Sequence, residues 1–231
     1  TFLSQSMALN LAEKDYSVLY FSYEVMIDNM IAKFKETGVD INKLKIYAPK
    51  KNTSGEVDWI KKKIIEAKEK FDVKFIFIDD VDFLYPSKKT FGSNQYRHVL
   101  GAISRELKGL AIELEVVIFF MAHVRKTPQG RAIELQDIGE SADLYKKADF
   151  VLAISRNSTE VNIGGLKTVV YQDHSTLRLL KNRISGEHPI IDLEVESGRL
   201  KQYGLKAKDM RDFTGEEKSD EIIITNDLFN N

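Results

Sequence analysis

VKFIFIDD, which runs from Val73 to Asp80, decides the fold of this chain. Five of the six residues from Val73 to Ile78 are β-branched or aromatic, which is typical of a strand buried on both faces of a parallel sheet. Ligands of open α/β sheets bind beyond the carboxyl ends of the strands, so Asp79 is placed to reach a cation held by substrate phosphates, as in a Walker B motif. The alternative is a solvated turn in which Asp79 only caps a helix.

Composition limits the classes of protein that fit. The chain has 231 residues, 43% of them hydrophobic, and no window apolar enough to span a bilayer. It has no cysteine, which excludes disulfides and thiolate metal sites and fits a reducing cytosol. Lys and Arg total 34 against 35 for Asp and Glu, so any nucleic-acid contact must come from local loops. We expect one large α/β domain, residues 1–203, and an acidic C-terminal tail, residues 204–231.

Apolar periodicity predicts alternating strands and helices from the first residue onward. Helices are expected from about Phe2, over 26–37 and 59–71, and from Val99 to Leu114; strands are expected over 18–23, 44–48 and 116–123. This alternation predicts a parallel sheet with right-handed crossovers. Because the amides at a helix start need a cap or an anion, we also expect further sequence upstream of Thr1.

TFLSQSMALN is followed by VLYFSYE within residues 1–24, and ISRELKGLAIEL covers residues 103–114. These segments resemble DnaB-type hexameric helicases: the first resembles their segment after the phosphate loop, and the second resembles their ISRxLKxLAxEL. The resemblance implies a first strand and a phosphate loop upstream of Thr1. DIGESADLYKKADFVLAISR, residues 137–156, aligns without a gap on DLRESGxIEQDADxVxxxxR, although Gly139 and Tyr145 depart from it. The strand ending in His123 points to the phage primase-helicase and Twinkle branch, because DnaB proper has Gln there.

The resemblance implies a RecA-like P-loop NTPase core, with a mostly parallel central sheet flanked by helices and antiparallel strands near the C-terminus. It implies ATP or another nucleoside triphosphate and Mg²⁺ as cofactors. Glu24 would orient and deprotonate the attacking water, Asp79 would hold Mg²⁺ through its water shell, and His123 would sense the γ-phosphate. Thr1 would be the residue after the motif's Mg²⁺-binding Ser or Thr, or that ligand itself. Arg156 would contact the nucleotide.

The resemblance also implies a ring and a DNA path. TLRLLKNRISGEHPIIDLEVE, residues 176–196, is predicted to form two strands joined by a turn, and its Lys181 and Arg183 match a KxR element that reaches the neighbouring subunit's γ-phosphate as an arginine finger. Two loops would hold single-stranded DNA through their basic residues: Lys88, Lys89, Arg125, Lys126 and Arg131. The lysine run Lys61 to Lys63, in contrast, is interpreted as a solvated helix face.

The sequence therefore predicts the motor domain of a ring-shaped, hexameric replicative DNA helicase from a phage or phage-like source, acting in a bacterial or phage-infected cytoplasm and not at a membrane. Its tail would contact a primase, loader or polymerase. Two alternatives stay open: a strand-exchange ATPase of the RecA or RadA type, and a non-catalytic assembly factor with the RecA fold. A GxxxxGK motif upstream of Thr1 would favour an enzyme.

Overall fold

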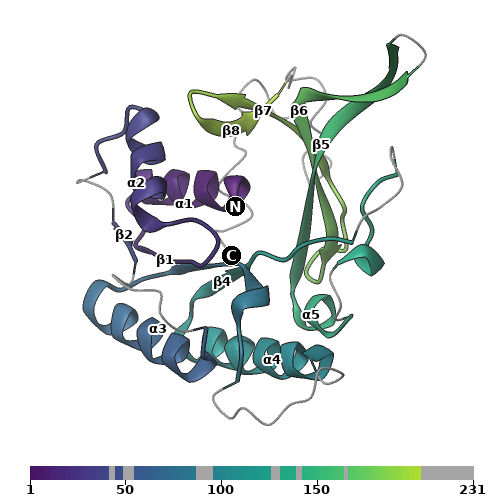
Figure 1. Ribbon diagram of the computed structural model, residues 1–231. Coiled ribbons are helices and arrows are strands. Elements are labelled where there is room, and N and C mark those ends of the chain that lie inside the picture. Colours follow the sequence, from purple (N-terminus) through teal and green to yellow (C-terminus); the bar gives the residue numbers. More distant parts are fainter. Residues whose placement is uncertain are drawn as a thin grey trace.

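The computed structural model describes residues 1–41, 45–48, 55–86, 96–125, 131–138, 142–163 and 166–203. At its centre is a parallel sheet with the strand order β2-β1-β3-β4 (Figure 1). The strands are β1 (Val18–Ser22), β2 (Ile46–Tyr47), β3 (Phe75–Asp79) and β4 (Val117–Phe120). Every residue of β1 and β3 is buried, as the continuous apolar runs predict for central strands.

Helices cover both faces of this sheet (Figure 1). The helices α1 (Phe2–Glu13) and α2 (Ile27–Glu36) lie on one face, and α3 (Val57–Phe71) and α4 (Tyr96–Leu114) lie on the other. Successive strand residues point to opposite faces, so Tyr20 and Phe77 pack toward α1, whereas Phe21 and Ile78 pack toward α3 and α4. The parallel sheet is thus the middle of three layers.

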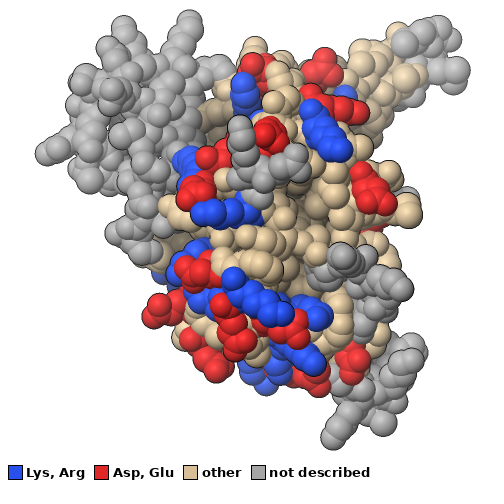
Figure 2. All heavy atoms as spheres, turned by 90° about the vertical axis from the view of Figure 1, so that its left-hand side faces the viewer, with Lys and Arg blue, Asp and Glu red and all other residues tan. Residues whose placement is uncertain are grey.

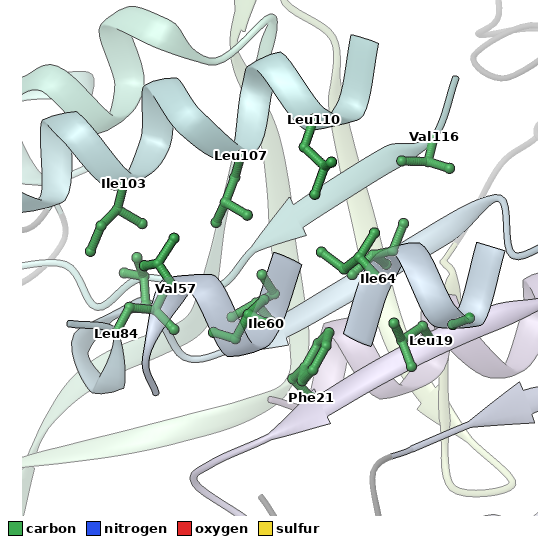
Figure 3. Packing of buried hydrophobic residues seen from close by; sticks show 14 of the residues in the cluster. Leu19, Phe21, Val57, Ile60, Ile64, Leu84, Ile103, Leu107, Leu110 and Val116 are labelled. Atoms are coloured by element: carbon green, nitrogen blue, oxygen red, sulfur yellow. The ribbon is translucent and has the colours of Figure 1, made fainter. Parts of the chain in front are cut away.

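The larger core cluster fills the space between the sheet, α3 and α4 (Figure 3). Ile60 and Ile64 of α3 and Leu107 of α4 are fully buried in it and pack with Leu19 and Phe21 of β1. Burying an aliphatic or aromatic side chain contributes about 1.5 to 3 kcal/mol, so this cluster holds β1 and β3 in a fixed register. That register positions the polar residues that follow the two strands.

A second, antiparallel sheet has the order β5-β6-β7-β8. Its strands are β5 (Phe150–Ile163), β6 (Leu166–Asn182), β7 (Ile190–Glu196) and β8 (Arg199–Gln202), and the short helix α5 (Ala142–Lys147) precedes it. The last strand docks on α1: the Leu200 amide donates to Ser6 Oγ over 3.1 Å, and the Arg199 guanidinium pairs with Glu13. The second sheet is thereby attached to the first helix.

The predicted α/β fold, with a parallel centre and antiparallel strands toward the C-terminus, is confirmed. Element boundaries differ in places. β4 ends at Phe120, so His123 lies in the segment after the strand instead of at its last position. The predicted tail, residues 204–231, lies outside the described residues. None of the described helices combines the length and the apolar composition needed to cross a membrane.

Candidate active site

Two acidic residues lie together at the carboxyl edge of the parallel sheet. Ser22 of β1 and Asp79 of β3 are register partners, and the Tyr23 amide donates to the Asp79 carbonyl oxygen over 2.7 Å. The Glu24 amide points at the same carbonyl oxygen at 3.4 Å. The strand pairing therefore brings Glu24, which is exposed, next to Asp79, whose side chain is buried. Both were predicted as site residues.

The Thr1 hydroxyl lies between these two carboxylates. Thr1 Oγ1 donates to Glu24 Oε2 and lies 3.3 Å from Asp79 Oδ1. Thr1 occupies the N-cap position of α1, so the start of this helix lies beside Glu24 and Asp79. A hydroxyl beside these carboxylates fits the role of Mg²⁺ ligand, and the choice between this role and that of the residue after the ligand stays a prediction.

The second oxygen of Asp79 is bound from inside the protein. Tyr20 OH donates to Asp79 Oδ2 over 2.8 Å, and Ser4 Oγ lies 2.7 Å from the Tyr20 hydroxyl and 3.4 Å from Asp79 Oδ2. Burial, followed by the charge of Asp79, raises the pKa of Tyr20 far above its ordinary value. The Tyr20 hydroxyl therefore keeps its proton and stays a hydrogen-bond donor at every physiological pH.

Asp80, and not Asp79, has the helix-capping role that the sequence suggested for Asp79. Asp80 precedes the 3₁₀ turn Val81–Phe83 and accepts from the Asp82 amide over 2.9 Å, and it also contacts His123 Nε2 at 2.8 Å. Burial raises the pKa of the Asp80 carboxyl above its ordinary value. Potential metal-ligand atoms of Asp80, Asp82 and His123 lie within 4.8 Å of one another. His123 is thus bound to Asp80, the residue that follows Asp79 in the chain. It lies beside the site in which it was predicted to act.

Of the five predicted DNA-binding residues, the structure describes two. Lys88, Lys89 and Lys126 lie outside the described residues. Arg125 is exposed, and its amide donates to the Asp137 carbonyl oxygen over 2.8 Å. The Arg131 guanidinium pairs with the Asp137 carboxylate and, at 3.5 Å, with Glu134. Arg131 therefore fastens the base of its loop to the 3₁₀ turn Leu135–Asp137, a role that the sequence did not indicate.

The side chains of Lys181 and Arg183 both lie at the carboxyl end of α5. Lys181 Nζ donates to the carbonyl oxygens of Tyr145 and Lys146 over 2.9 and 3.0 Å. The Arg183 guanidinium donates to Asp149 Oδ1 over 2.9 Å, and Lys108 donates to the same oxygen. Cations at a helix C-terminus meet unpaired carbonyl groups and the negative end of the helix dipole. Within the described part of the chain, Lys181 and Arg183 are therefore bound by carbonyl groups of α5 and by Asp149. Glu24 and Asp79 are not among their partners there.

Arg156, the predicted nucleotide contact, lies on β5 of the second sheet. Its Nε donates to the Gln172 carbonyl oxygen over 2.8 Å, and its guanidinium lies 5.5 Å from the centre of the Tyr171 ring. Arg156 is exposed on β5 of the antiparallel hairpin. Its role toward a nucleotide stays a prediction.

Charges are mixed in sign on the face of the molecule that Figure 2 shows. Figure 2 shows Lys and Arg side chains interspersed with Asp and Glu on the side that carries α2 and α3. Lys61 pairs with Asp58 and Glu106, and Lys63 pairs with Glu66. The lysine run on α3 therefore belongs to a solvated, ion-paired face, as the sequence indicated.

A parallel sheet between two helical layers, with an acidic pair beyond adjacent central strands and an antiparallel sheet following it, defines a RecA-like core. The chain belongs to the DnaB-like helicase C terminal domain family, whose model matches residues 24–202. A relative, the "Probable plasmid replicative DNA helicase" of Chlamydia muridarum (strain MoPn / Nigg), is 29% identical over 103 residues, which are 43% of this chain and 22% of the relative.

Two solved structures share the fold. One is of a DnaB-like replicative helicase, described with its interactions with primase; it has a TM-score of 0.71 and 20% identity over 85% of this chain and 54% of its own. The other is described as an ATPase domain; it has a TM-score of 0.70 and 19% identity over 85% of this chain and 78% of its own. The chain thus spans about a fifth of the curated relative and about half of the first structure.

Sequence reasoning missed Tyr20, Ser4 and Asp80 as parts of the site. Tyr20 sits within an apolar strand, where its ring fits the pattern and its hydroxyl gives no periodic signal. A buried tyrosine hydroxyl needs a hydrogen-bond partner, and that requirement is the one signal that pointed to a polar group nearby. The second carboxylate of the Asp79–Asp80 pair was visible in the sequence, but its contact with His123 depends on the fold.

The Arg131–Asp137 pair predicts a specific dependence of stability on pH. The Glu134 amide, and then Arg131, hold the pKa of the Asp137 carboxyl below its ordinary value. A lowered pKa in the folded state contributes stability above the unfolded pKa, about 3.9, which is lost as pH falls through the folded pKa. Asp137→Asn should therefore lower the free energy of unfolding at pH 7, and this difference should shrink as the pH falls through the lowered folded pKa of Asp137.

Urea unfolding followed by circular dichroism between about pH 2.5 and 7 measures this difference. Asp173→Asn is the matched control, because the Asp173 side chain is 97% exposed and should give a nearly pH-independent difference. An Asp137→Asn difference that does not shrink toward low pH would show that the pair does not stabilise the loop base.

Proposed function

We propose that this chain is the motor part of a ring-shaped replicative helicase that hydrolyses a nucleoside triphosphate to move along single-stranded DNA. The observation that carries the proposal is the meeting of Thr1, Glu24 and Asp79 at the carboxyl edge of the parallel sheet. Nucleotides bind at this edge in open α/β sheets. Membership of the DnaB-like helicase family favours this function over strand exchange.

The donor atoms at this edge fit Mg²⁺. The carboxylate of Asp79 and the hydroxyl of Thr1 are oxygen ligands, which Mg²⁺ prefers, and Asp79 Oδ1 is turned toward Thr1 Oγ1. When bound with a triphosphate, Mg²⁺ neutralises charge that develops on the phosphate oxygens. Asp79 would hold the ion through its water shell, and the start of α1 would direct amide groups toward the phosphates.

Glu24 supplies the base in this proposal. Its carboxylate is exposed and extends beyond β1 beside Asp79, so one of its oxygens can accept the proton of a water that attacks the γ-phosphate. His123, held by Asp80, would hydrogen-bond the γ-phosphate and lose that contact after hydrolysis. No covalent intermediate is required, because positioning and electrostatic stabilisation account for most of phosphoryl-transfer catalysis.

The ring completes the site. Lys181 lies near the end of β6 and Arg183 directly after it, where α5 and Asp149 hold them, and both would reach the γ-phosphate bound by the adjacent subunit. A positive charge there stabilises the transition state. Single-stranded DNA would run past the loops that carry Lys88, Lys89 and Lys126, and a primase, loader or polymerase would bind the tail.

The first test removes the proposed base. Glu24→Gln should retain nucleotide binding and lower turnover by about 10² to 10⁴ fold, because a positioned general base contributes that much. Steady-state phosphate release, measured in a chain that carries the phosphate loop before Thr1, gives the rate. Glu36→Gln, at an exposed position on α2, is the control and should hydrolyse at the unmodified rate. Near-normal turnover by Glu24→Gln would remove Glu24 from the mechanism.

A second test asks whether Arg183 acts across the subunit interface. Arginine fingers contribute roughly 10³ to 10⁵ in rate, so Arg183→Ala should abolish hydrolysis in a uniform ring. Rings mixed from Arg183→Ala and Glu24→Gln subunits should regain activity, because some interfaces then combine an intact Glu24 with an intact Arg183. Rings in which Glu24→Gln subunits are mixed with the double variant are the inactive control. Mixed rings that never recover activity would contradict the trans assignment.

A third test concerns the DNA path. Each phosphate contact on a single strand contributes about −0.7 to the slope of log affinity against log salt, so removing Lys126 and Arg131 together should flatten the slope by roughly 1 to 1.5. Fluorescence anisotropy with assembled rings and a non-hydrolysable triphosphate measures it. Because Arg131 also fastens the loop base, Asp137→Asn is the control: it loosens the same base and keeps both cations. Equal effects of the two variants would place the DNA elsewhere.

A further inference from the structure

Tyr20 is a buried phenol that the proposed chemistry does not use. Its side chain is 0% exposed in the middle of β1, and its hydroxyl lies 2.8 Å from Asp79 Oδ2. Ser4 of α1, also 0% exposed, lies 2.7 Å from the same hydroxyl. Three polar side chains from α1, β1 and β3 therefore meet inside an otherwise apolar cluster, directly beneath the acidic edge of the sheet.

The hydrogen bonds can be assigned by counting protons. Ser4 Oγ has one proton, and the carbonyl oxygen of Thr1 at 2.6 Å is its nearest acceptor. The Tyr20 proton is then free for Asp79 Oδ2, which has no closer donor among the described residues than this hydroxyl. Asp79 Oδ2 is thereby engaged, while Oδ1 faces Thr1.

The Tyr20 ring is held by its neighbours across the sheet. Tyr20, Phe77 and Phe119 are register partners on three adjacent parallel strands. Tyr20 stacks on Phe77 with ring centroids 5.6 Å apart, and Phe77 stacks on Phe119 with centroids 4.6 Å apart. A ring packed in this way has little freedom to rotate, so its hydroxyl is a fixed reference point for the carboxylate of Asp79.

We propose that Tyr20 is a positioning residue for Asp79: it binds Oδ2 and so presents Oδ1 to the hydrated Mg²⁺ of the bound nucleotide. The inference rests on the proposed nucleotide site and names a residue that controls its metal affinity. A phenylalanine at this position would leave the buried Oδ2 with Ser4 at 3.4 Å as its nearest side-chain partner, and the carboxylate would be free to turn.

The test is Tyr20→Phe, which removes one oxygen atom and keeps the ring stack. Partners that orient a metal ligand typically contribute about 10 to 100 fold to metal affinity, and a ligand acting through water belongs at the lower end of that range. Mg²⁺ titrations of a fluorescent non-hydrolysable triphosphate, in a chain that carries the phosphate loop, should show half-maximal Mg²⁺ raised by about tenfold. Binding of the same nucleotide in EDTA should not change.

Tyr16→Phe is the matched control. Tyr16 packs edge-on against Phe75 in the same apolar cluster, and it precedes β1 at the opposite end from Asp79. The Tyr16→Phe variant should leave the Mg²⁺ dependence of nucleotide binding unchanged. The inference is wrong if Tyr20→Phe matches the unmodified chain, if both tyrosine variants shift Mg²⁺ equally, or if Tyr20→Phe weakens nucleotide binding equally with and without Mg²⁺. An unmodified chain with no Mg²⁺ dependence would overturn the proposed function itself, and this inference with it.

A second measurement tests the inference if the Tyr20→Phe chain does not fold. 3-Fluorotyrosine at position 20 keeps the ring and the hydroxyl and adds a reporter beside the hydrogen bond. Its fluorine resonance should move when Mg²⁺ is added to the nucleotide complex, whereas fluorotyrosine at position 16 should not respond. A resonance at position 20 that ignores Mg²⁺ would overturn the inference.

Discussion

A carboxylate buried beside an apolar cluster needs hydrogen-bond donors, and the rest of this site depends on how Asp79 obtains them. Its side chain is 1% exposed at the end of β3, so its oxygens need partners from within the protein. Tyr20 from β1 donates to one oxygen, and Thr1 at the start of α1 lies near the other. The same contacts that satisfy the buried charge therefore fix three elements around the proposed phosphate position.

The two central strands and the acidic residues at their carboxyl ends could be predicted, because local sequence patterns indicate them. The apolar run before Asp79 and the one before Glu24 mark two buried strands, and parallel pairing then places their carboxyl ends together. α1 was harder to interpret. Its buried face includes Ser4, Gln5 and Ser6, so a search for apolar residues alone misses the hydroxyls that contact β1, β3 and β8.

Contacts between distant segments could not be predicted from periodicity. The basic residues Arg131 and Arg183 were assigned to DNA and to a neighbouring subunit, and each also binds a carboxylate of its own chain, Asp137 and Asp149. Such pairs orient a long side chain and, where exposed, add little to stability. In the proposed ring, the bond to Asp149 would hold Arg183 in one direction before a neighbour arrives.

The most direct measurement is to locate the divalent ion itself. Mn²⁺ can replace Mg²⁺ in a crystal of a chain extended before Thr1 by a phosphate loop, with a non-hydrolysable triphosphate bound, and its anomalous scattering marks its position. We expect one peak beside Thr1, roughly 4 Å from Asp79 Oδ1, as one bridging water requires. A peak among Asp80, Asp82 and His123, with none beside Asp79, would contradict it.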